Sequence, residues 1–251
     1  MRAQILYHFG SNAEISKAER GLAHVVEHLI FKGTKKEREF LASESPLQTK
    51  RDTITRDELE AYFVEHSKSP ARELAKMGAL YLSEADIDAI GRRFGATLNA
   101  FTSIDKTSYF FECGPNNLEP FLMILSNSAQ ASSFKNDHIN SEIKAVLQEM
   151  KMGNDDVQRT AFQASQEMLY GVNENGHLST IGSELDLMKL DSSCVQKFFE
   201  RNYKPWRASL FIVGDFDNTE VEAWVGDYFN YGVDEHRAAQ LSAALRIVRR
   251  C

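Results

Sequence analysis

Two histidines and a glutamate lie within five positions near the start of the chain, in the order His24, Glu27 and His28. On a helix, residues four apart share one face, so these two imidazoles can reach the same metal ion. Glu27 lies beside that face, where its carboxylate can accept a proton from an activated water molecule. The spacing predicts a metal site with a general base. The alternative is a helix with two surface histidines and a solvated glutamate.

A metal site of this kind needs a third ligand, because a catalytic zinc ion usually takes three protein ligands and keeps one position open. Glu142 and Glu149 lie seven residues apart in the stretch SEIKAVLQEM, so their carboxylates project from one side of a helix. Both border an apolar stripe, and a partly buried carboxylate needs a partner such as a metal ion. The alternative is that both are exposed charges paired with Lys144 or Lys151.

The composition restricts the classes of protein to consider. The chain has 251 residues, of which 43% are hydrophobic and 26% charged, which is typical of a soluble globular protein. Its net charge of -7 argues against nucleic-acid binding, which needs a basic face. No stretch approaches the roughly 20 apolar residues of a membrane span. Three widely spaced cysteines favour a reducing compartment, the cytosol or an organelle matrix, without identifying it.

Apolar periodicity and turn residues predict the elements that position these side chains. Strands are expected at 3–9, 96–103, 106–113 and 207–217, the middle two joined by a tight hairpin at Ile104 and Asp105. Helices are expected at 19–31, 86–95, 118–130, 138–153, 157–171, 191–203 and 219–229. This mixture favours an α+β fold, with helices packed on one face of a largely antiparallel sheet.

We expect one domain over residues 1–232, followed by a tail at 233–251 that the pattern does not place. A polar stretch at about 37–83 interrupts the domain and is interpreted as a partly helical insertion. Within it, helices are expected over 56–66, after a capping-box pattern, and over 71–82, after a serine-proline pair.

Taken together, the motifs resemble the pitrilysin/insulinase zinc peptidases, the inverzincins, which include the mitochondrial processing peptidases. The resemblance rests on H-x-x-E-H followed by a downstream E-x6-E helix. It extends to GATLNAFTSIDKTSYFF (95–111) and NYKPWRASLFIVGDFD (202–217). The implied fold is that of the family's first domain. One departure is a longer separation between the two motifs, which the insertion accounts for.

The resemblance implies a role for each candidate side chain. His24, His28 and Glu149 would bind one zinc ion, and Glu27 would activate water. Glu142 would be a supporting carboxylate that orients a ligand or tunes the site. The implied activity is that of a zinc endopeptidase acting on extended or unfolded polypeptides.

The resemblance also implies a substrate strand and an incomplete assembly. Asn99 and Ala100 would lie on an edge strand beside the zinc ion and receive the substrate as an added β-strand; the alternative is plain strand packing. The chain accounts for about one of the family's domains, so further domains or a partner subunit would close the chamber. The competing interpretation is a non-catalytic zinc-binding or structural subunit of a larger assembly.

Overall fold

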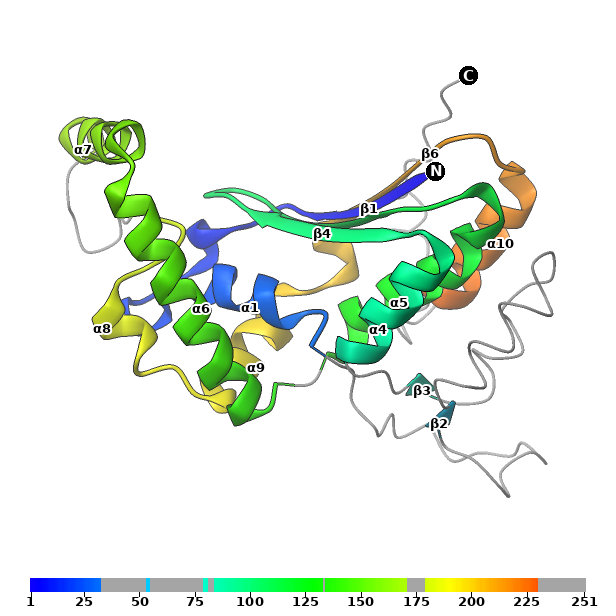
Figure 1. The fold of residues 1–251 in the computed structure, drawn as a ribbon, viewed down its shortest axis with the longest axis horizontal. Coiled ribbons are helices and arrows are strands. Elements are labelled where there is room, and N and C mark those ends of the chain that lie inside the picture. Colours follow the sequence, from blue (N-terminus) through cyan, green and yellow to red (C-terminus); the bar gives the residue numbers. More distant parts are fainter. Residues whose placement is uncertain (33–52, 55–78, 81–83, 133, 171–178, 230–251) are drawn as a thin grey trace.

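In the computed structural model, a twisted sheet lies over a layer of helices (Figure 1). The structure describes residues 1–32, 53–54, 79–80, 84–132, 134–170 and 179–229. Among these residues, the helices lie on one face of the sheet, as the sequence predicts, except for the helix at residues 157–170, which lies beyond the end of the sheet and contacts the helix before it. The α+β class is therefore confirmed. No helix of the described part is long and apolar enough to cross a bilayer.

The main sheet has four antiparallel strands in the order β4-β5-β1-β6. Their bounds are Thr97–Thr102, Thr107–Glu112, Arg2–Tyr7 and Ala208–Val213 respectively. Each lies within its predicted range except β1, which begins one residue earlier. Strand β4 is at one edge of the sheet, and the chain returns from it to β5 through the predicted hairpin.

Alternation along the strands explains why one face of the sheet holds the core. Ala3, Ile5 and Tyr7 of β1 are buried, whereas their neighbours in the strand are half-exposed. Ile5 pairs with Tyr109 of β5 on one side and with Leu210 of β6 on the other, and all three are buried. Since a strand alternates its side chains between two faces, these residues form an apolar layer beneath the sheet.

The helices follow the predicted order with small differences at their ends. The structure contains α1 Leu22–Leu29, α4 Glu84–Phe94, α5 Leu118–Ala131, α6 Asn136–Asp155, α7 Val157–Tyr170, α8 Glu184–Leu187, α9 Ser192–Asn202 and α10 Asn218–Tyr228. Short 3-10 turns occur at η1 Ser11–Ala13, η2 Lys17–Glu19, η3 Pro115–Asn117 and η4 Pro205–Arg207. Asp191 caps α9 as predicted, since its carboxylate accepts a hydrogen bond from the Cys194 amide.

Helix α1 lies centrally beneath the sheet and is shorter than the predicted range of 19–31. Residues 17–19 form the separate turn η2, and Gly21 adopts a left-handed φ of 84°, which starts the helix at Leu22. A glycine tolerates this φ because it has no Cβ. Leu22, Val25, Val26 and Leu29 are fully buried, so the helix is anchored on its apolar side.

Two expectations about local structure were wrong or incomplete. Residues 79–80, within the helix predicted at 71–82, instead form strand β3 (Ala79–Leu80), which pairs in parallel with β2 (Thr53–Ile54). Main-chain pairing here overrides a local helix propensity, which is a weak constraint. The four-residue helix α8 was missed because it is too short to show a periodicity. The other residues of the predicted insertion helices, and the tail at 233–251, lie outside the described residues.

Candidate metal centre

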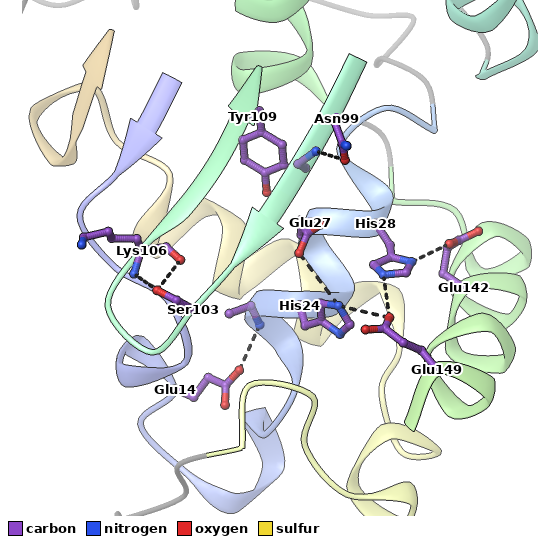
Figure 2. A network of polar contacts seen from close by, with 12 residues as sticks. Glu14, His24, Glu27, His28, Asn99, Ser103, Lys106, Tyr109, Glu142 and Glu149 are labelled. Carbon is purple, nitrogen blue, oxygen red and sulfur yellow. Dashed lines mark hydrogen bonds and ion pairs between the residues drawn. The ribbon is translucent and has the colours of Figure 1, made fainter. Parts of the chain in front are cut away.

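Helices α1 and α6 pack side by side and bring His24, His28 and Glu149 together (Figure 2). His24 Nε2 lies 3.5 Å from Glu149 Oε2, and His28 Nε2 lies 3.7 Å from the same oxygen. One donor atom from each of the three residues lies within 4.8 Å of the other two. Tetrahedral zinc ligands with bonds of about 2.0–2.1 Å would be roughly 3.3 Å apart. The three side chains therefore fit a single zinc ion.

His24 is suited to bind a metal because it is uncharged at neutral pH. Burial, with smaller contributions from the charges of His28 and Arg159, lowers the pKa of His24 to about 4. A neutral imidazole has a free lone pair, which a metal ligand requires. Within the described part of the chain, the buried Nδ1 of His24 has no hydrogen-bond partner, so the polar contacts of this ring are those of Nε2 with Glu149 and Glu27.

His28 is held differently, through a hydrogen bond on the other side of its ring. Its Nδ1 lies 3.1 Å from Glu142 Oε2 (Figure 2), and the Glu142 side chain is largely buried. A carboxylate can only accept a hydrogen bond, so this contact places the hydrogen on Nδ1 of His28 and leaves the Nε2 lone pair facing Glu149. Glu142 thus contacts the candidate ligand His28 without being one of the three candidate ligands itself, a position from which it can orient the imidazole ring.

Glu27 lies beside the three donors, with Oε2 3.9 Å from His24 Nε2. Its side chain is only 12% exposed. Burial raises the pKa of this carboxyl, and the nearby Glu149 acts in the same direction. A carboxylate with a raised pKa is a stronger base, which suits proton transfer from water near neutral pH.

Asn99 and Ala100 lie on the edge strand β4, which packs beside α1. Ala100 pairs with Tyr109 of β5, so its side chain faces the helices, whereas Asn99 is exposed on the opposite face. The Ala100 amide donates a hydrogen bond of 2.8 Å to its neighbour's side chain, Asn99 Oδ1, in place of a strand partner. The structure thus places an edge-strand amide near α1.

Two residues near the centre were missed from the sequence. Lys32 lies four residues after His28 and contacts Glu142, with Nζ 3.0 Å from Oε1; helical spacing could have revealed it. Burial lowers the pKa of Lys32, but hydrogen bonds to Glu84 and Glu142 outweigh this, so the pKa is raised overall. Glu14 accepts a hydrogen bond of 3.0 Å from the Ala23 amide at the start of α1. Nothing in the sequence pattern indicates that contact.

Comparison with known sequences places most of the chain in two family matches. Residues 2–70 and 60–179 match the family model described as insulinase (peptidase family M16). Residues 189–231 match the model described as the peptidase M16 inactive domain.

Curated relatives and solved structures that resemble the chain are also proteases or processing peptidases, with low sequence identity to it. The chain is 25% identical over 88% of its length to the "Probable zinc protease PqqL" of Escherichia coli, of which it spans 19%. It is 28% identical over 86% of its length to the chloroplastic stromal processing peptidase of Arabidopsis thaliana, spanning 13%. A protease from Helicobacter pylori has a similar fold, with a TM-score of 0.68 at 24% identity, over 93% of this chain and 46% of that one. The chain therefore spans less than half the length of each.

Proposed function

This chain belongs to the insulinase family of peptidases (M16), and from that membership we propose that it is a zinc-dependent endopeptidase domain that hydrolyses extended or unfolded polypeptides with metal-activated water. The observation that carries the proposal is the placement of His24, His28 and Glu149 donors within 4.8 Å of one another. Glu27 lies beside them as a buried carboxylate of raised pKa.

The proposed ligands are His24, His28 and Glu149, which would hold one zinc ion per chain. When bound there, zinc would supply Lewis-acid chemistry, polarising a carbonyl and making water more acidic. The chain's own contribution begins with Glu27, which accepts the water proton and can return it to the leaving amine. Burial of Glu27 keeps bulk water away from this proton transfer, and Glu142 orients the His28 ring through its Nδ1–H.

The proposed substrate is an extended peptide because the edge strand β4 can accept one as an added strand. Main-chain groups of Ala100 would hydrogen-bond the peptide, and the Asn99 side chain would release the Ala100 amide that it now occupies. Binding by strand addition uses main-chain hydrogen bonds, which do not depend on the side chains of the peptide. It therefore suits unfolded polypeptides as a class of substrate. Further family domains or a partner subunit would enclose the substrate, since the chain spans less than half of its relatives.

The test is hydrolysis of an unfolded peptide by the zinc-loaded chain and by Glu27→Gln. Loss of the base should reduce the rate by about 10²–10⁴-fold and leave zinc binding intact. A Glu222→Gln variant is the matched control, since Glu222 lies on α10, remote from α1 in the fold, and should change neither. Equal hydrolysis by the parent and Glu27→Gln would contradict the proposed role of Glu27.

A second candidate is a non-catalytic zinc-binding or structural subunit. It is favoured by the match of residues 189–231 to a model described as an inactive domain and by the partial length of the chain. Stoichiometric zinc without hydrolysis, even after addition of a complementing domain, would support this candidate over the endopeptidase.

A further inference from the structure

Lys32 lies at the point where α1 continues into one further turn. Its amide donates a hydrogen bond of 3.1 Å to Leu29 O, so the helical path extends beyond the last residue of α1. A residue four positions after His28 on that path lies on the same side as His28. The ammonium group is thereby directed along the face of α1 that carries the candidate ligands.

The Lys32 ammonium and the His28 imidazole share one carboxylate. Glu142 Oε1 lies 3.0 Å from Lys32 Nζ, and Glu142 Oε2 lies 3.1 Å from His28 Nδ1. Each carboxylate oxygen therefore has a donor of its own, and the group cannot rotate without losing one of them. The Glu142 side chain is only 11% exposed, so water offers little replacement for either donor.

The charge of Lys32 matters because the centre contains three carboxylates. Glu27, Glu142 and Glu149 all lie close to the two histidines. Among the residues that the structure describes, Lys32 is the one lysine or arginine within ion-pair distance of any of these three. Without Lys32, Glu142 Oε1 would lose its cationic partner, and the side chain could turn toward solvent, because a buried unpaired carboxylate is costly. His28 Nδ1 would then lose the acceptor that fixes its tautomer.

Lys32 has a second ion-pair partner besides Glu142. Its ammonium also pairs with Glu84, the first residue of α4. Lys32 precedes the predicted insertion at about 37–83 and Glu84 follows it, so this ion pair joins the two residues that flank the insertion, next to the Glu142 carboxylate.

From these contacts we propose that Lys32 is a positioning residue for the zinc centre: it holds Glu142 in the orientation that fixes the His28 ring for metal binding. The inference rests on the proposed zinc site. Lys32 is not one of the three proposed zinc ligands, and it acts through Glu142 and His28.

The test measures zinc affinity of the full chain by competition with a chromogenic chelator. Lys32→Met keeps the length of the side chain and removes its charge, and we expect zinc affinity to fall by at least about 10-fold, as for loss of other groups that orient metal ligands. Lys32→Arg restores a cation that can reach a carboxylate and should recover most of that loss. Lys189→Met, at an exposed lysine paired with Asp186, is the control and should bind zinc like the parent.

A double-mutant comparison separates positioning from general destabilisation. If Lys32 acts through Glu142, then Lys32→Met should change zinc affinity less than about 2-fold in a Glu142→Gln background. The metal-free Lys32→Met chain should remain folded and unfold cooperatively in urea, although loss of the ion pair to Glu142 lowers the urea concentration at its midpoint. Additive losses in the double variant, or a fall in affinity matched by unfolding of the metal-free chain, would overturn the inference.

The outcomes also distinguish this inference from the proposed function. If the parent binds zinc and Lys32→Met binds it equally well, the positioning role is wrong and the zinc site stands. If the parent binds no zinc, the proposed function fails and this inference fails with it.

Discussion

His24 and His28, the two histidines of the candidate centre, have different surroundings, and each suits metal binding for a different reason. His24 is made neutral by burial, which lowers its pKa to about 4. His28 is oriented by the Glu142 carboxylate on its Nδ1. His24 thus depends on exclusion of water and His28 on a hydrogen bond. Substitutions around His24 should therefore affect its pKa, whereas substitutions around His28 should affect the orientation of its ring.

The three candidate ligands could be predicted from the sequence because helical geometry fixes their relations within each helix. Spacings of four residues for the histidines and seven for Glu142 and Glu149 place each pair on one helix face. The packing of α1 on α6 is not encoded locally, so helical spacing alone did not distinguish the two carboxylates. The family resemblance indicated Glu149 as the ligand, and the structure showed that Glu142 contacts His28. Lys32 and Glu84 were missed for the same reason, since they meet across the insertion.

A pH-dependent contribution to stability is expected from the ion pair between Glu19 and Arg201. Burial raises the pKa of Glu19, but hydrogen bonds from Arg201 and the Ile15 amide, with the arginine's charge, outweigh this and lower the pKa overall. The pair, with Arg201 Nη2 2.6 Å from Glu19 Oε2, ties η2 to α9. A lowered folded-state pKa stabilises the native state above the ordinary glutamate pKa, and this stability is lost as the pH falls through the lowered value.

Glu19→Gln should therefore lower the free energy of unfolding at pH 7 by up to about 1 kcal/mol, because the pair is partly solvent-screened. The difference from the parent should shrink as the pH falls from 5 toward 3. Urea unfolding curves at several pH values measure it. A difference that grows on acidification would contradict the assigned sign.

Among the elements, α1 shows how a distant residue defines a helix start. Its N-cap residue, Gly21, has no side chain to cap the helix, and the Glu14 carboxylate accepts a hydrogen bond from the Ala23 amide instead. The neighbouring η1 segment also holds the β4–β5 hairpin, since the Ser11 and Asn12 amides donate to Ser103 O and Ile104 O. The segment from η1 to Glu14 thus contacts both helix α1 and the hairpin that follows the edge strand β4.

Glu14→Ala should lower the free energy of unfolding by about 1–2 kcal/mol, the usual loss for a helix cap whose amide is left unsatisfied. Glu14→Gln retains an oxygen acceptor and should lose less. Urea unfolding of the metal-free chain provides the measurement. Equal stability of the parent and Glu14→Ala would show that the cap is not needed for α1.

Element prediction from the sequence succeeded where the pattern was local and long. The strands of the hairpin and helices α5, α6, α9 and α10 lie within a few residues of their predicted bounds. The start of α1 was misplaced because it depends on Gly21 and on the distant Glu14. Strand β3 was missed because pairing with β2 outweighed local propensity.

At the scale of the whole molecule, the sheet and the other helices surround the short helix α1, which carries His24 and His28. The sheet covers α1 from one side, and α6 and α9 contact it in the helix layer (Figure 1). This arrangement brings the candidate ligands of α1 next to Glu149 of α6 and also next to the edge strand β4. The candidate metal centre and the edge strand β4 thus lie side by side in a chain that spans less than half the length of its relatives.

The most direct test of the account is the zinc content of the purified chain, measured by elemental analysis beside His28→Ala and Glu149→Gln. The account predicts about one zinc ion per parent chain and a loss of zinc from both variants, each of which should remain folded by circular dichroism. A parent chain without zinc, or variants that bind zinc as well as the parent does, would contradict the three-ligand centre.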